Sequence, residues 1–227
     1  MDIILLHGAI GASDQLIPLS NQLTSLGYKC HLLDFSGHGR KSIADSLSIE
    51  QFSNELNAII ESKNLVQPHV FGYSMGGYVA LYLANKQPER LGKIITLGTK
   101  FHWNEEIAKV ESKKLNPEKI LEKVPKFAAI LEKRHGSKWK ELLHQTALMM
   151  EGLGKEPLLT VSIYNSIANK VLIGLADSDE MVSLEETVNV RKAIQSSSMF
   201  ILPSTKHPIE TVNIDLLSSI IENFIRP

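Results

Sequence analysis

The stretch VFGYSMGGYVALYLA, residues 70–84, joins a short apolar run to a longer one through a serine set among glycines. The first run has the length of a buried strand and the second that of a helix. Gly72-Tyr73-Ser74-Met75-Gly76 fits the pattern G-x-S-x-G. In this pattern an abrupt strand-to-helix turn strains the serine and projects its hydroxyl outward, while the glycines let strand and helix approach closely. The stretch therefore predicts a strand, a candidate nucleophile at Ser74 and a helix.

The same alternation of strand and helix extends over most of the chain. The expected strands are continuous Val/Ile/Leu runs, which is typical of a parallel sheet covered by helices on both faces. The strands are expected at 2–6, 28–35, 68–73, 92–98, 170–176 and 198–203, and the helices at 14–26, 48–63, 75–87, 183–195 and 209–225. Capping boxes are expected where Ser48 precedes Gln51 and where Ser183 precedes Glu186.

The stretch 100–168 interrupts this pattern. It contains no convincing strand, and helical segments are expected at 117–133, 137–152 and 155–167. The sequence therefore predicts a core domain of residues 1–99 and 169–227, with residues 100–168 inserted as a helical cap over the strand ends.

The composition is the one expected of an ordinary soluble globular protein. Of the 227 residues 43% are hydrophobic and 22% charged, and the formal net charge is -1 with no basic or acidic block. This balance gives no reason to expect nucleic acid or a membrane surface as a partner. MDIILLHG is not expected to be a signal peptide, and Cys30 is the single cysteine, which favours a reducing, cytoplasmic setting.

A serine hydroxyl needs a base to take its proton. In sheets of this kind the chain order is nucleophile, acid, then histidine. His207, in LPSTKHPIE after the last expected strand, is the histidine that satisfies this order. The loop after strand 170–176 reads DSDEMVS and offers Asp177, Asp179 and Glu180. Spacing alone does not choose between the two aspartates.

A developing oxyanion needs two N–H donors. One is expected from Met75, the residue after the serine. The other is expected from Ala9, in the loop LLHGAIG (5–11) that ends the first strand.

The pieces LLHGAIG, DFSGHGRKS, GYSMGG, ADSDEMVS and TKHPIE, in that order, resemble the α/β-hydrolase superfamily. They span nearly the whole chain outside 100–168, where members commonly carry a small helical cap. The resemblance implies Ser74 as nucleophile, His207 as base, and Ala9 and Met75 as oxyanion donors. In the family's acid loop an aspartate is followed by two residues and a valine. DEMV fits from Asp179, so the resemblance favours Asp179, with Asp177 as the alternative.

Two features differ from the family pattern. The family's usual two-stranded hairpin is absent before the strand at 2–6, so we expect a six-stranded, wholly parallel sheet. The acid loop ends in Val182-Ser183 rather than Val-Pro, which we expect to change only the start of the next helix. His38 in GHGR is expected to be a structural loop residue.

The expected substrate pocket follows the strand 92–98. Its wall is predicted to include Phe101, His102 and Trp103, with Met149 from the cap, and Trp139 and Met150 as further candidates. Lys100, Lys109, Lys113 and Lys114 are interpreted as solvated charges near the cap entrance.

A serine nucleophile excludes reactions that need a carboxylate nucleophile and supports acyl transfer to water. We therefore expect a serine hydrolase that cleaves a carboxylic ester with a small or medium acyl group through an acyl-enzyme. Two alternatives stay open: a triad-bearing lyase or carbon–carbon hydrolase acting on a metabolite, and a non-catalytic ligand-binding protein. No metal or organic cofactor is expected, and the partner is a small-molecule substrate of a monomer or homodimer.

Overall fold

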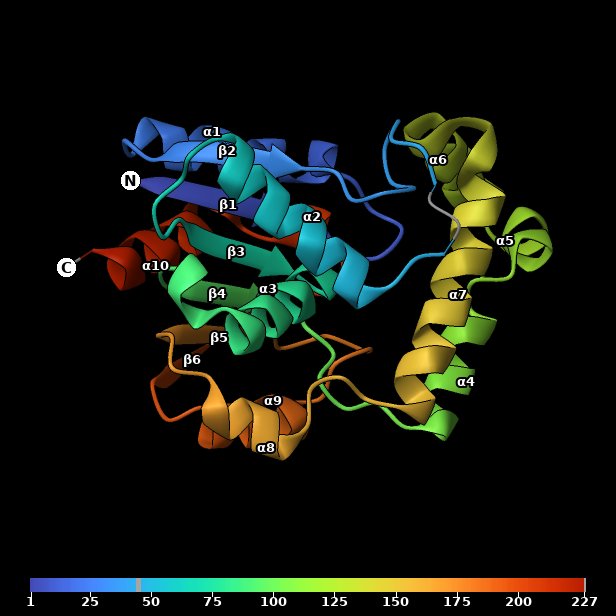
Figure 1. Ribbon diagram of the computed structural model, residues 1–227. Coiled ribbons are helices and arrows are strands. Elements are labelled where there is room, and N and C mark those ends of the chain that lie inside the picture. Colours follow the sequence, from blue (N-terminus) through green and yellow to red (C-terminus); the bar gives the residue numbers. More distant parts are fainter. Residues whose placement is uncertain (44–45, 227) are drawn as a thin grey trace.

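The computed structural model describes residues 1–43 and 46–226. Six strands form one sheet in the order β2-β1-β3-β4-β5-β6, and each neighbouring pair is parallel (Figure 1). The strands are β1 (Asp2–Leu6), β2 (Lys29–Leu33), β3 (His69–Tyr73), β4 (Ile94–Leu97), β5 (Val171–Ala176) and β6 (Ser197–Leu202). The six-stranded, wholly parallel sheet predicted from the sequence is confirmed.

Successive residues of each strand face opposite sides of the sheet, and each side has its own core. On one side Ile3 and Leu5 of β1 pack with helices α1 (Ile17–Ser25) and α10 (Ile214–Ile225). On the other side Ile4 and Leu6 pack with α2 (Ile49–Ser62), α3 (Met75–Lys86) and α9 (Leu184–Ala193). Burial on both faces explains why the strands read as continuous apolar runs.

The two expected capping boxes differ in the structure. At α9 the Ser183 hydroxyl accepts from the Glu186 N–H, and the Glu186 carboxylate accepts from the Ser183 N–H. At α2 the Ser48 hydroxyl accepts from the Gln51 N–H, but the Gln51 amide donates to Glu55 instead of closing the box. The capping box at α2 is therefore only half formed, because the Glu55 carboxylate, one helical turn further along, binds the Gln51 side chain.

Between β4 and β5 the chain forms a stack of helices beside the carboxyl ends of the strands (Figure 1). The stack consists of α4 (Glu105–Lys113), α5 (Pro117–Lys123), α6 (Pro125–His135) and α7 (Trp139–Lys155). We call these four helices the α4–α7 layer. The next helix, α8 (Val161–Ser166), lies beside α9 instead, and Tyr164 of α8 belongs to the main core. The division into a core domain and a cap of residues 100–168 stays a prediction.

The order of the strands places two loops at one crevice. The chain runs from β1 to β2 on one side and then returns to lay β3 on the other side of β1. The loops after β1 and β3 therefore diverge at the carboxyl edge, which is where sheets of this kind bind ligands. Among the described residues no helix is both long and apolar enough to cross a bilayer.

Candidate active site

Ser74 stands at the seam between β3 and α3 in a left-handed backbone conformation, with φ 51° and ψ -117°. A non-glycine residue held in such a conformation costs about 1–3 kcal/mol and needs support from its surroundings. Its N–H donates to the Leu97 carbonyl at 2.8 Å, and its carbonyl accepts from the Thr99 hydroxyl at 2.9 Å. Neighbouring β4 and the loop after it therefore hold the strained turn in place.

The glycines of the pattern are required by crowding. A Cβ on Gly72 would lie 2.4 Å from the Gly77 nitrogen, and a Cβ on Gly76 would lie 2.5 Å from the Leu6 carbonyl oxygen. Side chains at these two positions would push α3 away from β3 and β1. The G-x-S-x-G pattern thus matches a strand–turn–helix seam that only glycine permits.

The loop after β1 passes directly over this seam. A Cβ on Gly8 would lie 2.9 Å from the Tyr73 ring and 3.1 Å from the Ser74 Cβ. The Gly11 N–H donates to the Gly8 carbonyl at 3.1 Å, which closes a turn with Ala9 and Ile10 at its centre. The structure therefore brings Ala9 and Ser74 to the same place, and both line one cavity with Met75.

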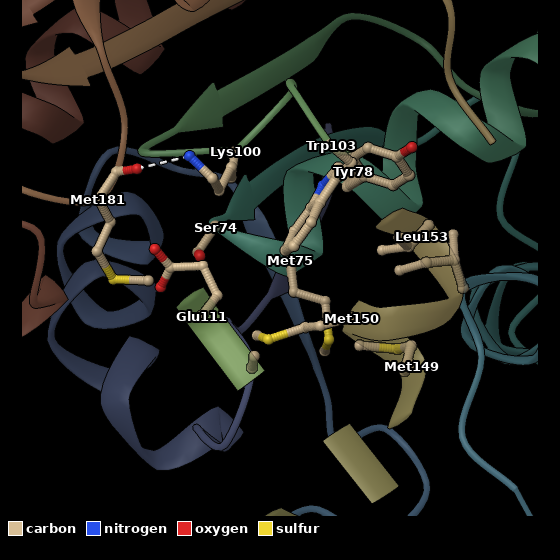
Figure 2. A pocket seen from close by; sticks show the side chains of 12 residues that line it. Ser74, Met75, Tyr78, Lys100, Trp103, Glu111, Met149, Met150, Leu153 and Met181 are labelled. Atoms are coloured by element: carbon tan, nitrogen blue, oxygen red, sulfur yellow. Dashed lines mark hydrogen bonds between the residues drawn. The ribbon is translucent and has the colours of Figure 1, made fainter. Parts of the chain in front are cut away.

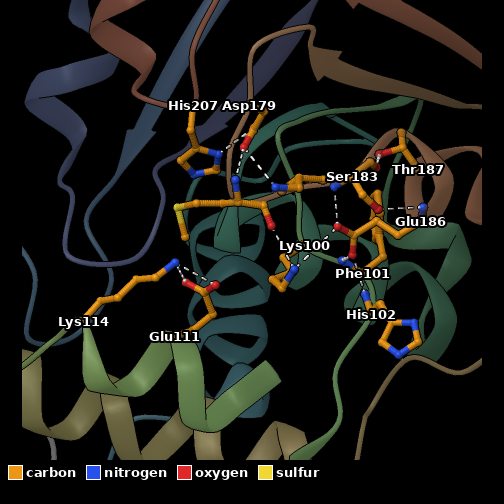
Figure 3. A network of polar contacts seen from close by, with 12 residues as sticks. Lys100, Phe101, His102, Glu111, Lys114, Asp179, Ser183, Glu186, Thr187 and His207 are labelled. Atoms are coloured by element: carbon orange, nitrogen blue, oxygen red, sulfur yellow. Dashed lines mark hydrogen bonds and ion pairs between the residues drawn. The ribbon is translucent and has the colours of Figure 1, made fainter. Parts of the chain in front are cut away.

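His207 and Asp179 meet from two loops at the carboxyl edge (Figure 3). The His207 Nδ1 lies 2.7 Å from the Asp179 Oδ2, and the Asp179 side chain is 1% exposed. The other carboxylate oxygen accepts from the N–H groups of Met181 and Val182 at 2.8 and 3.0 Å. Burial by itself would raise the pKa of Asp179, but the hydrogen bond and charge of His207 and these two amides lower it below its usual value. Asp179 is therefore an anion that orients the His207 ring.

Asp177 lies apart from this pair. Its carboxylate accepts from the backbone N–H groups of Ser204 and Thr205 at 2.8 and 2.9 Å. These two hydrogen bonds lower the pKa of Asp177, and the one from the Thr205 amide has the larger effect. Asp177 therefore ties the loop after β5 to the loop that carries His207.

Further contacts place the Asp179–His207 pair beside the Ser74 seam. Tyr73 donates its hydroxyl to the His207 carbonyl at 2.9 Å, and the two rings lie 5.5 Å apart. Gly98 has φ 60°, and a Cβ there would lie 3.3 Å from the Asp179 Oδ2. Tyr73 precedes Ser74 and Gly98 follows Leu97. Both residues therefore lie against the Asp179–His207 pair.

The cavity at Ser74 is lined mainly by apolar side chains from α3 and the α4–α7 layer (Figure 2). Its volume, measured as the space open to the centre of a water molecule, is about 40 Å³. A single water needs about 10–15 Å³ on this measure, so the cavity has room for a short chain of atoms. Its lining residues are Ala9, Ile49, Ser74, Met75, Tyr78, Lys100, Trp103, Glu111, Met149, Met150, Leu153 and Met181.

The predicted pocket residues divide into two groups. Trp103, Met149 and Met150 line the cavity. Phe101 is buried in the main core against Tyr164, with ring centroids 6.0 Å apart, and His102 lines a neighbouring groove with Asp179. Phe101 and His102 do not line the cavity at Ser74, because the backbone N–H of each residue donates to the Glu186 carboxylate. These two hydrogen bonds turn the segment toward α9. Trp139 packs inside the α4–α7 layer, in a small core of its own.

Two charged residues of the cavity were not expected there. Lys100, interpreted above as a solvated charge, is 15% exposed, donates to the Met181 carbonyl at 2.9 Å and lies 3.6 Å from Glu186 (Figure 3). Glu111 of α4 is 8% exposed and takes both of its hydrogen bonds from Lys114 at 2.9 Å. Glu111 stands on the same side of the cavity as Ser74 (Figure 2).

The sequence offered no signal for Glu111 or Met181. Their places depend on how α4 packs on α7 and on how the loop after β5 meets the loop that carries His207. Within residues 1–43 and 46–226 no group of three or more His, Cys, Asp or Glu side chains is arranged to hold a metal ion.

Comparison with known proteins supports the geometry at the level of the family. Residues 3–128, more than half of the chain, match the family model described as alpha/beta hydrolase fold. A pimeloyl-[acyl-carrier protein] methyl ester esterase of Aeromonas hydrophila is 33% identical over 100 residues, 43% of this chain and 37% of that protein. A 2-hydroxy-6-oxononadienedioate/2-hydroxy-6-oxononatrienedioate hydrolase of Escherichia coli is 30% identical over 104 residues, 42% of this chain and 35% of that protein. The matches thus span little more than a third of these curated relatives.

Solved structures resemble the whole fold. An esterase from Exiguobacterium antarcticum superposes with a TM-score of 0.81 at 17% identity, covering 100% of this chain and 92% of that one. An esterase from Thermogutta terrifontis gives a TM-score of 0.79 at 18% identity, covering 100% and 89%. At such identities the likeness concerns the fold alone. With the family model matched over most of the sheet and the strand–turn–helix seam in place, the chain belongs to the alpha/beta hydrolase family.

Proposed function

We propose that this hydrolase cleaves carboxylic esters through an acyl-enzyme formed on Ser74. The observation that carries the proposal is the hydrogen bond between the buried Asp179 and His207, held beside a strained serine that opens into an apolar cavity. A ligand-binding protein has no need for a buried carboxylate aimed at a histidine ring next to such a serine.

The hydrogen bond assigns the protons of the His207 ring. The Asp179 Oδ2 accepts at Nδ1, so Nδ1 carries a proton and Nε2 is free to act as a base. In the proposed mechanism Nε2 takes the Ser74 proton as Oγ attacks the carbonyl carbon. The same nitrogen then protonates the leaving alcohol, and later it takes a proton from the water that hydrolyses the acyl-enzyme.

The negative charge that develops on the carbonyl oxygen is assigned to two backbone amides. Met75 is the first residue of α3, so its N–H has no acceptor inside the helix. The positive end of the helix dipole adds to its effect. Ala9 supplies the second N–H from the turn that passes over Ser74. Loss of one such donor typically costs about 10²–10³ in turnover.

The cavity favours a short, uncharged acyl group. Its wall is mostly apolar, and its only cation among the described lining residues, Lys100, is already bonded to the Met181 carbonyl and faces Glu186. A dicarboxylate substrate, such as the Escherichia coli relative's name implies for that enzyme, would meet no unpaired positive charge here. Ester cleavage is therefore preferred to carbon–carbon hydrolysis. We further propose a cytoplasmic protein, in keeping with its single cysteine.

Covalent capture and turnover test this proposal together. The wild-type protein should be labelled once per chain by a fluorophosphonate probe, and Ser74→Ala should not be labelled. In a panel of p-nitrophenyl esters, acetate to butyrate should give higher kcat/KM than octanoate. A folded wild-type protein that is neither labelled nor active on any ester, thioester or lactone would favour the ligand-binding alternative.

A further inference from the structure

We propose that His135, on helix α6, positions the oxyanion donor of Ala9. The inference rests on the proposed function and extends it to a residue of the α4–α7 layer. His135 holds the backbone carbonyl of Ile10, the residue after Ala9, and so fixes the turn that presents the Ala9 N–H beside Ser74.

The hydrogen bonds of His135 define the state of its ring. The ring is buried, at 1% exposure. Its Nδ1 lies 3.0 Å from the Gly39 nitrogen, and since that N–H can only donate, Nδ1 is the acceptor. The proton is therefore on Nε2, which donates to the Ile10 carbonyl at 2.9 Å. Burial lowers the pKa of His135, which keeps the ring in the neutral form that both bonds require.

Ile10 needs this support because of its backbone conformation. It has φ 52°, in the left-handed region that β-branched residues rarely adopt. It occupies the turn closed by the Gly11 N–H and the Gly8 carbonyl, directly after Ala9. Nothing in the residue's own preference would keep the turn in this shape.

The α4–α7 layer holds Ile10 at two points. Its carbonyl accepts from His135, and its side chain packs against the small core within the layer. That core consists of Ile120, Ala128, Leu131, Trp139 and Leu143. The turn that carries the proposed oxyanion donor is thus shaped by the helices that cover the site and not by the sheet alone.

Neighbouring contacts attach the same end of α6 to the core without touching this turn. The Arg134 guanidinium lies 3.0 Å from Asp14 and 3.7 Å from Glu210. Arg40 donates to the Lys133 carbonyl at 3.0 Å. Arg134→Ala therefore weakens the attachment of α6 and leaves the bond to Ile10, so it is the matched control for His135.

Release of the Ile10 carbonyl should act on the transition state. The Ala9 N–H bonds the carbonyl oxygen most strongly when that oxygen is charged, so a displaced donor lowers kcat more than it raises KM. A displacement of about 1 Å can cost about 100-fold. An inhibitor that forms a charged tetrahedral adduct, such as a trifluoromethyl ketone, should weaken in parallel with kcat.

Three variants at position 135 separate the two hydrogen bonds. His135→Phe removes both, His135→Asn places its amide near the former Nδ1 and cannot reach Ile10, and His135→Gln extends an N–H to the former Nε2. We expect Phe and Asn to lower kcat about 10- to 100-fold with KM within about twofold, and Gln to recover at least fivefold over Asn. The trifluoromethyl ketone inhibition constant should rise by the same factors, and Arg134→Ala should leave kcat and inhibition unchanged.

Active sites are counted with the fluorophosphonate probe, so that unfolded protein does not enter kcat. If Asn and Gln have equal kcat and equal inhibition per active site, His135 has only a structural role and the inference is wrong. The Asn–Gln comparison decides this even if His135→Phe fails to fold. If the wild type is active and the variants at position 135 have the same kcat and inhibition constant as the wild type, only this inference is wrong. If the wild type is neither labelled nor active, the proposed function is wrong and this inference fails with it.

Discussion

Asp177 and Asp179 lie two residues apart after β5, yet they occupy different environments. Asp177 caps the amides of Ser204 and Thr205 at the surface, and Asp179 turns inward against His207. Both could be turn formers by composition. The choice depends on where the loop 203–207 passes, which is decided by contacts between residues 27 and 28 positions apart in sequence. Before the structure, only the resemblance of DEMV to the family's acid loop favoured Asp179.

Replacement of each aspartate by asparagine should separate their roles. Asp179→Asn should lower kcat by about 10³- to 10⁴-fold, because the amide no longer stabilises the imidazolium or fixes the ring tautomer. Asp177→Asn should cost less than about tenfold, since the loop keeps an oxygen acceptor at that position. Steady-state kinetics on the best ester of the panel, normalised to probe-titrated active sites, gives both numbers. Equal losses in the two variants would contradict the assignment of Asp179.

At the level of elements, the helices between β4 and β5 show where sequence patterns are weak. The expected helix 117–133 is two helices, because Pro125 lacks an N–H and disfavours a helical conformation at Val124, the residue that follows the end of α5. α4 was not expected at all. Its residues are mostly polar, and its start is signalled only by Asn104, whose side chain accepts from the Ile107 N–H. Packing on α7 supplies the stability that its sequence lacks.

The contact between α4 and α7 depends on one glycine and not on its neighbour. A Cβ on Gly154 would lie 2.4 Å from the Ala108 Cβ and 2.9 Å from the Asn104 carbonyl, whereas a Cβ on Gly152 would meet nothing within 4 Å. Gly152→Ala should raise stability by about 0.5–1 kcal/mol through helix propensity. Gly154→Ala should lower stability by about 1–3 kcal/mol, because α4 must move away.

Urea unfolding curves of the two glycine variants provide the measurement, with each variant serving as the control for the other. If both alanines stabilise the protein, α4 and α7 are not in close contact in solution. If both destabilise it, helix propensity does not dominate at position 152.

At the level of the whole molecule, three buried histidines join segments that are distant in sequence. His7 after β1, His38 in the loop after β2 and His135 of α6 are each at most 1% exposed, with ring centroids 4.8 Å apart for the first two and 6.1 Å for the last two. His38 was expected to be structural and stands at the centre of this cluster, which links the sheet to the α4–α7 layer. Burial lowers the pKa of His7 to about 4 and that of His38 well below its ordinary value.

This cluster should make the stability of the protein depend on pH. A histidine whose pKa is lower in the folded state than in the unfolded state binds its proton on unfolding, so stability falls as pH drops through the interval between the two values. For His7 the interval runs from 6.5 down to about 4, which corresponds to a loss of about 3 kcal/mol.

Urea unfolding at half-unit steps from pH 7 to pH 4.5 tests this expectation. The free energy of unfolding of the wild type should fall by at least about 1.4 kcal/mol per pH unit below pH 6. The fall in His7→Asn should be smaller by about 1.4 kcal/mol per pH unit, the contribution of one proton taken up on unfolding. A wild-type free energy of unfolding that stays constant over this range would mean that the cluster is solvated or already charged.

The sequence by itself determined the alternation of strands and helices, the parallel sheet and the strand–turn–helix seam at Ser74. These features follow from hydrophobic runs and from glycines that local crowding requires, and both are written in short stretches of the chain. It also predicted His207 as the base and narrowed the proposed acid to one short loop, because the chain order of nucleophile, acid and histidine assigns these two residues to the loops after the last two strands.

Only the tertiary structure decided which aspartate meets His207, that Lys100 and Glu111 line the cavity, that Phe101 and His102 turn away from it, and that His135 holds Ile10. Each of these depends on contacts between segments far apart in the chain. Their energies come from burial and hydrogen-bond geometry, which a local pattern of residue types does not contain.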